Sequence, residues 1–452
     1  MAAEGDVTLA GRQVRQEGVA LATTTTRTRG TIHLLNSAAD AKGSIVLAPE
    51  SVTAVLIDDD GSTALDSQRN ALIKESAEQD LLRHRQAPGV FDNLSRLSDR
   101  RDQSRIEIVS GGDIQFQGGS LALATGGQIA ATAARRSFVA QGAELDVAGA
   151  VGVRIAMASN SVKINVQGNE LRDAPNNRDA AKLFNGELWV DRRSLIPVAA
   201  GVGGYEGERW YTAGGLLEVG GYLANLGHGI GEWAAQGGTV TLGGKEVVAQ
   251  SDSRMNLAGG TLDVAEGVIN LSWLRGADGR LYEASSAPAD RVYAGLYRGY
   301  EDLHATLAQK ATRRFLNPVL APSTRREAGY TVGRDAGRLV LSAPTAVVES
   351  EIVATVYDGA RQTQARAAGT DGYGQGQLAV ARAGGLALGN YGALGRVNVF
   401  NTDVKLGRYA DITLAMDAGD ALAPSASARC GWTARGCPTW AWAHWIWRPA
   451  AR

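Results

Sequence analysis

The chain has 452 residues, of which 57 are glycine, and its 46 basic and 47 acidic side chains leave a net charge of −1. A hydrophobic content of 44% excludes a disordered chain, and glycine does not recur at every third position, which excludes collagen. The charge balance argues against nucleic acid as the main partner, and no apolar run reaches the roughly 18 residues of a transmembrane helix.

Residues 1–62 are predicted to form coils of short strands. The amino terminus reads MAAEGDVTLAGRQV, which has no basic region followed by an apolar run and therefore no secretory signal. Since VTLAG is already strand-like, we expect the chain to be a fragment that begins inside a patterned segment.

Residues 63–105 are predicted to form a helical insertion. Ile73, Ala77 and Leu81 fall at i, i+4 and i+8, which places them on one face of an amphipathic helix. Ala87, Pro88 and Gly89 end that helix.

Residues 106–168 are predicted to return to coils. Gly-Gly pairs recur every seven or eight residues through GGDIQFQGGSLALATGGQIAAT at 111–132, and the residues between them alternate between apolar and polar side chains. Alternation with period two indicates strands, and glycine suits turns that need positive φ. The segments QGAELDVA at 141–148 and AGGTLDVA at 258–265 resemble each other and show the same pattern of a glycine followed by a short alternating strand.

Such repeats favour an all-β fold, a right-handed parallel β-helix (β-solenoid) with helical and loop insertions. Stacked coils share one continuous core, and small inward side chains suit a narrow interior. A β-sandwich would show hairpin signals and more buried aromatic residues, and a propeller would show a motif in each blade of about 40–45 residues. About 15 coils of about 22 residues, each advancing ~4.8 Å, would span about 70 Å.

Residues 169–236 are predicted to form a loop-rich insertion, which holds the candidate surface-binding loop. In GYEGERWYTAGG, Tyr205, Arg209, Trp210 and Tyr211 have the chemistry to stack on a sugar ring or an aromatic ligand. The alternative is that they anchor the loop to the coil wall. The same two interpretations apply to Trp189 and to Arg192-Arg193, and His228 near Trp233 is a candidate haem ligand.

The remaining chain is divided in the same way. Residues 237–275 are predicted as coils, 276–335 as a second helical insertion and 336–422 as coils. In the helical insertion Val292, Leu296, Tyr300, Leu303 and Leu307 keep helical spacing, and Asn317-Pro318 closes it.

The last stretch, 423–452, differs in composition from everything before it. It contains both cysteines, Cys430 and Cys437, and five of the nine tryptophans, but from Pro424 onward no Asp, Glu, Lys, Leu or Val. A globular module needs Leu or Val for its core. We interpret this tail as out-of-frame translation or a disordered segment, with an aromatic binding tail as the alternative.

The sequence provides no catalytic, cofactor-binding or metal-binding motif. The five histidines are far apart with no HExxH, no GxSxG occurs, and Gly244-Lys245 lacks the rest of a phosphate loop. Asp113, Asp146 and Asp263 stand isolated between strand residues, unlike the clustered acids of pectate-lyase-type enzymes on the same fold. We therefore expect no enzyme, no cofactor and no metal.

Several non-repetitive segments resemble one family. Residues 91–130, 183–205, 209–223, 228–248, 256–283 and 329–341, which include LFNGELWVDRRSLIPVAAGVGGY and RWYTAGGLLEVGGYL, are similar to filamentous-haemagglutinin-like exoproteins. The resemblance covers most of residues 1–422, although the family's amino-terminal secretion domain has no counterpart in this chain.

The resemblance implies a two-partner-secretion protein of a Gram-negative bacterium. Its partners would be the outer-membrane transporter that threads the full-length protein and a host surface receptor or glycan, and it would lie outside the cell or on its outer surface. The function it implies is a non-catalytic adhesin, a rigid stalk that displays loops for attachment. The alternatives are a haem or haem-carrier binding exoprotein, a polysaccharide-acting β-helix enzyme and a toxin-delivery stalk.

Overall fold

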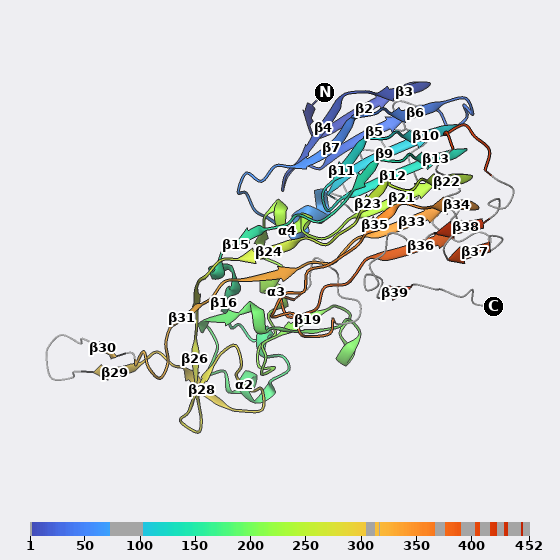
Figure 1. Cartoon of the computed structure of the whole chain (residues 1–452). Coiled ribbons are helices and arrows are strands. Elements are labelled where there is room, and N and C mark those ends of the chain that lie inside the picture. Colours follow the sequence, from blue (N-terminus) through green and yellow to red (C-terminus); the bar gives the residue numbers. More distant parts are fainter. Residues whose placement is uncertain are drawn as a thin grey trace.

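Three long parallel sheets run side by side through one part of the structure (Figure 1). The computed structural model describes residues 2–72, 103–303, 312–315, 317–366, 376–389, 403–406, 416–422, 429–432 and 444–445. Strands greatly outnumber helices in these residues, so the expectation of a mainly β chain is confirmed.

Each sheet has its own spatial order of strands. Sheet 1 runs through β1 (Ala2–Glu4), β4 (Val19–Thr24), β7 (Val52–Ile57), β11 (Leu121–Ala124), β14 (Glu144–Asp146), β23 (Arg254–Asn256) and β35 (Glu351–Val353). Sheet 2 runs through β2 (Asp6–Ala10), β5 (Gly30–Leu35), β9 (Ser104–Ser110), β12 (Gln128–Ala133), β21 (Thr239–Gly243), β33 (Arg338–Ser342), β36 (Gly385–Gly389) and β39 (His444–Trp445). Sheet 3 runs through β3 (Gln13–Gln16), β6 (Ser44–Leu47), β10 (Asp113–Phe116), β13 (Arg136–Val139), β22 (Glu246–Ala249), β34 (Thr345–Val348), β38 (Arg429–Trp432) and β37 (Asp403–Leu406).

The chain visits the three sheets in rotation. A strand of sheet 1 is followed by one of sheet 2 and one of sheet 3, and the next strand of sheet 1 then pairs in parallel with the previous one. Sheet 1 has seven strands, so the described chain makes seven such turns. This is about half the number estimated from chain length, because long excursions between the strands take up many residues.

Aligned aliphatic side chains form the core between the sheets. In sheet 2 the register places Val7, Ile32, Ile106, Ile129 and Val240 in one line across successive strands. All five belong to one buried cluster in which Phe116 is the single aromatic member among the described residues. Small and branched side chains therefore fill the interior between the sheets.

Glycine shapes the turns for two different reasons. Four successive turns from sheet 3 to sheet 1 place one residue at positive φ, and these residues are Glu50, Gly119, Gly142 and Asp252. Gly238, in contrast, precedes a strand of sheet 2, and a Cβ there would lie 1.9 Å from the carbonyl oxygen of Gly127. The prediction that glycine supplies positive φ at turns therefore holds at both corners, since Gly5 and Gly126 do so between sheets 1 and 2, whereas close backbone contact is the reason for glycine at 238.

The four long excursions that precede β36 leave the coils at the same corner, whereas the later connection between β37 and β38 joins two strands of sheet 3. Residues 58–103, 147–238, 257–337 and 354–384 each connect a strand of sheet 1 to the next strand of sheet 2. Figure 1 shows much of this material gathered at one side of the strand stack. We call the packed assembly formed by the described residues of 150–234 and 265–335 the lobe.

The lobe and its junction with the coils consist of short elements. The strands are β8 (Ala64–Leu65), β15 (Val153–Ile155), β16 (Ser161–Asn165), β17 (Glu187–Asp191), β18 (Ile196–Val198), β19 (Arg209–Tyr211), β20 (Gly227–His228), β24 (Thr261–Val264), β25 (Gly267–Asn270), β26 (Trp273–Gly276), β27 (Leu281–Glu283), β28 (Tyr293–Leu296), β29 (Tyr300–Leu303), β30 (Thr312–Phe315), β31 (Thr324–Glu327) and β32 (Tyr330–Gly333). The helices are η1 (Met157–Asn160), η2 (Asn169–Leu171), α2 (Pro175–Ala180), η3 (Arg192–Ser194), η4 (Val202–Gly204), α3 (Gly220–Leu223) and α4 (Ile230–Ala234).

The prediction of a helical insertion over residues 276–335 is wrong for the part that the structure describes. Residues there form β27, β28, β29, β30 and β31, which pair antiparallel. Gly295 and Gly299 have φ of 143° and 89°, which a helix does not admit. The apolar spacing of this segment therefore reflects hairpins.

The other boundaries also differ from those expected. Coil strands end at Asp146 and Asn256, ahead of the expected limits of 168 and 275, and residues 354–384 form a further excursion within 336–422. In the first insertion residues 66–72 are helical, whereas Ile73, Ala77 and Leu81 lie outside the described residues. In the tail, Arg429–Trp432 form β38, which pairs in parallel with β34 and β37.

Candidate functional site

The lobe has an apolar core separate from that of the coils. Its buried members include Ile164, Leu188, Leu217, Leu274 and Tyr293, which come from both the second and the third excursion. The two excursions therefore fold as one packed unit that positions the candidate loop.

The candidate loop lies on β19, which pairs with β18 as an antiparallel hairpin. The guanidinium of Arg209 lies 3.8 Å from the centre of the Tyr205 ring and donates to the Tyr211 hydroxyl at 2.7 Å and to the Val202 carbonyl at 2.7 Å. Asp173 accepts from Tyr205 at 3.2 Å and also from the Tyr211 hydroxyl. Arg209 and the two tyrosines are thus engaged with one another and with Asp173, so they are held within the lobe and not against the coil wall that the anchoring alternative named.

Burial of Tyr211 reinforces this assignment. The side chain is 9% exposed, and this burial, with the neighbouring Asp173 carboxylate, raises the pKa of Tyr211 to about 12. A phenol so placed stays neutral and acts as a hydrogen-bond donor inside the lobe.

Trp210 points away from that cluster into a cavity. Its indole nitrogen donates to the Glu208 carboxylate at 2.9 Å, which fixes the ring, and its backbone amide donates to Glu218 at 3.4 Å. The ring is half-buried and lines a cavity of about 280 Å³, which we call the Trp210 chamber. Of the four candidate residues, only this one therefore presents an aromatic surface to an open space.

The chamber is built from three separate excursions. Its wall contains Asp66 from the first, Arg192, Leu195 and Trp210 from the second, and Gln377 from the stretch before β36. A second cavity, of about 210 Å³, shares Arg192, Leu195 and Gln377 with it.

Arg192 is the basic side chain at the junction of these cavities. It is half-buried and, among the described residues, has no carboxylate within ion-pair distance. Three arginines nearby are paired instead: Arg193 with Asp191, Arg209 with Asp173 and Arg366 with Asp335. A half-buried guanidinium without an ion pair retains its donors for a ligand.

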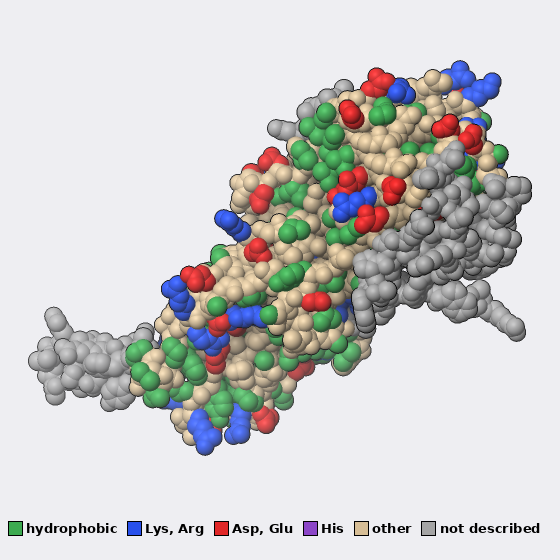
Figure 2. Space-filling view, viewed as in Figure 1, with side chains coloured by type: hydrophobic (Ala, Val, Ile, Leu, Met, Phe, Trp, Pro, Cys, Tyr) green, Lys and Arg blue, Asp and Glu red, His purple; other side chains and the backbone are tan. Residues whose placement is uncertain are grey.

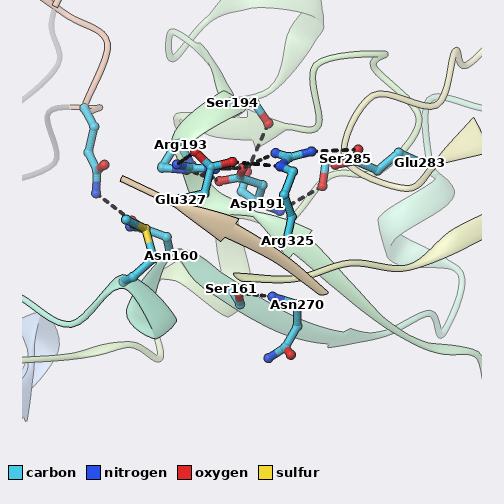
Figure 3. Close-up of polar contacts among 12 residues, drawn as sticks. Asn160, Ser161, Asp191, Arg193, Ser194, Asn270, Glu283, Ser285, Arg325 and Glu327 are labelled. Carbon is cyan, nitrogen blue, oxygen red and sulfur yellow. Dashed lines mark hydrogen bonds and ion pairs between the residues drawn. The ribbon is translucent and has the colours of Figure 1, made fainter. Parts of the chain in front are cut away.

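A partly buried ion-pair network, shown in Figure 3, includes Arg193, the residue that follows Arg192 in the chain. Arg193 contacts Asp191 at 2.6 Å and Glu327 at 3.2 Å, and Arg325 contacts Glu327 at 2.7 Å and Glu283 at 3.4 Å. The hydrogen bond from Arg193, assisted by Arg325, lowers the pKa of Glu327 to about 2. Because these groups belong to β17, η3, β27 and β31, the network joins the second excursion to the third.

The last excursion joins the same network. Arg361 approaches Glu327 at 3.4 Å and lies 4.2 Å from the centre of the Tyr330 ring. Gln377 accepts from the Tyr330 hydroxyl and donates to Asn160 at 2.8 Å. Gln377 is thereby held in position where it lines the chamber.

His228 is held by a partner of its own. Its Nδ1 lies 2.9 Å from Glu232, one helical turn away, while β20 pairs with β8. Burial raises the pKa of Glu232, but the hydrogen bond to His228 and nearby positive charge, that of Arg192 included, outweigh this effect and leave that pKa below its usual value. Asp66, which lines the same space, accepts from the Trp233 indole at 2.8 Å.

The isolated aspartates are occupied with neighbours in adjacent strands. Asp113 pairs with Arg135, Asp146 accepts from Asn256 and Asp263 accepts from Thr331. Within the described ranges, no group of three or more His, Cys, Asp or Glu side chains is gathered in the manner of a metal site.

Sequence reasoning singled out Trp210 and the Arg192-Arg193 pair but missed Asp66 and Gln377. These two residues are more than 100 positions from Trp210, and only the common exit corner brings them to it. No local pattern in the sequence marks such a meeting.

No family model, curated protein or solved structure matches the chain. Among the helices that the structure describes, none combines the length and apolarity needed to cross a membrane.

Proposed function

We propose that the chain is a segment of a right-handed parallel β-helix from a filamentous-haemagglutinin-like exoprotein, and that it acts without catalysis as a stalk that displays the lobe for attachment. The three-sheet rotation supports the β-helix, since parallel connections within a sheet are almost always right-handed. The family assignment rests on the sequence resemblance.

The confinement of the four excursions before β36 to one corner is the observation that carries this proposal. Up to β36 the connections at the other two corners have at most eight residues, so the coils stay uniform there while one side bears a folded lobe. A uniform support with one elaborated side is the arrangement expected of a display scaffold.

Dimensions and charge agree with such a scaffold. The seven parallel strands of sheet 1, at ~4.8 Å spacing, extend about 29 Å from the first strand to the last. Figure 2 shows acidic and basic side chains interspersed on the visible face, with no continuous field of either sign among the coloured residues. This surface gives no support to a polyanion such as nucleic acid as the main partner.

Location and export follow from the resemblance. The full-length protein would pass an outer-membrane two-partner-secretion transporter and fold outside a Gram-negative cell, where the lobe would meet a host receptor or glycan. Slow formation of non-local parallel pairs suits a chain that must remain unfolded during export.

Attachment of beads coated with residues 1–452 to cultured epithelial cells tests this function. We expect attachment above albumin-coated beads, blocked by antibody fragments that bind the exposed lobe residues Val319 and Leu320, which are 87% and 65% exposed. Fragments that bind the outer face of sheet 1 at Val19 serve as the matched control and should leave attachment unchanged. Attachment no greater than that of albumin, or blocked equally by both fragments, would overturn the proposal.

A further inference from the structure

We propose that the Trp210 chamber binds a single carboxylate-bearing sugar ring, with Arg192 paired to the carboxylate and Trp210 stacked on the ring. This inference names a ligand class for the lobe and so rests on the proposed attachment function. It concerns only the chemistry of the chamber and can be measured in solution without cells.

The apolar side of the chamber suits the carbon-rich face of a pyranose. Leu195, Leu223 and Leu226 line it together with the indole of Trp210. The hydrogen bond to Glu208 holds the indole, so that little side-chain freedom is lost when a ring stacks against it.

Arg192 selects the acid. It is the arginine that lines this chamber, and no carboxylate lies within 4 Å of it in the part of the chain that the structure describes, whereas the neighbouring Arg193 and Arg209 are already paired. A guanidinium offers two parallel N–H donors, which match the two oxygens of a carboxylate. A bound acid would therefore give Arg192 an ion-pair partner.

The remaining polar groups favour a sugar over a simple carboxylate or a polyanion. Asp66 and His228 line the chamber and are oriented by Trp233 and Glu232, so their outward atoms are fixed for hydroxyl groups. The negative charges of Asp66 and Glu208 in the same wall repel a second anionic group. A polysulfated chain is thus disfavoured, and a ligand with one charge and several hydroxyls fits.

The chamber volume sets the size of the ligand. At about 280 Å³ it falls just below the roughly 300–1,000 Å³ of sites for drug-sized molecules, which leaves room for one ring. Further sugars of a glycan would extend into solvent.

Calorimetric titration and ligand-observed NMR of the full chain test the proposal with methyl β-glucuronide, the methyl glycoside of N-acetylneuraminate and methyl β-glucoside. The glucoside is the matched neutral probe because only its CH₂OH replaces the carboxylate of the glucuronide. We expect at least one acid to bind tenfold or more tightly than the glucoside, and the two acids distinguish a uronate from a sialate. No acid binding, or equal binding of acid and glucoside, would overturn the proposal.

Variants then assign the contacts. Arg192→Gln should remove the preference for the acid, and Arg192→Lys, which keeps the charge, should weaken acid binding several-fold. Arg326→Gln, at a side chain that is 74% exposed outside the chamber, is the control and should bind like the parent. Trp210→Ala should abolish binding of acid and glucoside alike, and unchanged acid binding by Arg192→Gln would refute the assignment. If beads attach to cells but no acid binds, the sugar proposal alone fails, whereas acid binding without attachment contradicts the function.

Discussion

Two glycine-to-alanine changes separate the two roles of glycine in the coils. At Gly142, with φ of 77°, a new Cβ would meet nothing closer than 3.5 Å, so its cost is that of a left-handed conformation, about 1–2 kcal/mol. At Gly238 no positive φ is involved, but the Cβ would lie 1.9 Å from the carbonyl oxygen of Gly127. An ordinary contact between a carbon and an oxygen atom is longer than this distance by more than 1 Å, so the two adjacent strands must separate by about that amount.

The separation at Gly238 breaks ladder bonds that are otherwise short. The Gly127 carbonyl accepts from Thr239 at 2.9 Å and the Gly238 amide donates to Val147 at 2.7 Å. Losing two net bonds of about 1 kcal/mol each and leaving a buried carbonyl unsatisfied costs about 3–5 kcal/mol in total. Gly238→Ala should therefore be the more destabilising change by about 2 kcal/mol or more.

Urea unfolding of residues 1–452, followed by circular dichroism, measures both effects against the parent. Equal m-values would show that the variants change the free energy of unfolding and not the extent of structure. The reasoning is refuted if Gly238→Ala costs no more than Gly142→Ala.

Three further predictions concern a turn, an acid and a phenol. Glu50 has φ of 60°, so Glu50→Gly should raise the free energy of unfolding by about 0.5–1 kcal/mol in urea; a decrease would contradict the turn argument. The pKa of Glu327 is about 2 against an ordinary 4.5, so its contribution to the free energy of unfolding is complete above pH 4.5 and is lost as pH falls toward 2. Glu327→Gln should therefore flatten the fall in the free energy of unfolding between pH 4.5 and 2. An unchanged dependence of that free energy on pH would contradict the prediction. Because the pKa of Tyr211 is raised to about 12 from 10, its contribution to the free energy of unfolding is present below pH 10 and is lost as pH rises through 12. The difference between the ultraviolet titrations of the parent and of Tyr211→Phe should show a phenol that ionises near pH 12. Ionisation near pH 10 would contradict the burial of this side chain.

The parallel coils could be predicted because their signal is local and repeated. Alternation in segments such as DIQFQ survives in β10, where Ile114 and Phe116 point into the core. Each coil needs small inward side chains and tight turns, so a pattern recognised in one coil predicts the strands of the others.

The lobe could not be predicted in the same way. Val292 and Leu296 satisfy helical spacing, but Gly295 and Gly299 adopt positive φ, and β28 pairs with β26 across the intervening strand β27 in the sequence. Tertiary pairing there overrides a local period that only a few apolar residues define.

The candidate site was predicted in part. The aromatic and basic composition of the loop at 205–211 marked it, but composition does not reveal that Arg209 and Tyr211 turn inward while Trp210 turns outward. Alternation along β19 explains the outcome, since neighbouring side chains of a strand face opposite sides.

The single exit corner has a consequence for how such a chain can change. Length added between a strand of sheet 1 and the next strand of sheet 2 leaves the register of the stack intact, as excursions of 46, 92, 81 and 31 residues at 58–103, 147–238, 257–337 and 354–384 already demonstrate. The four-residue turns at 48–51, 117–120, 140–143 and 250–253 tolerate no such growth, because each closes with a backbone hydrogen bond from its fourth residue to its first. Foreign peptides grafted for display should accordingly be accepted between a strand of sheet 1 and the next strand of sheet 2, and rejected at these four-residue turns.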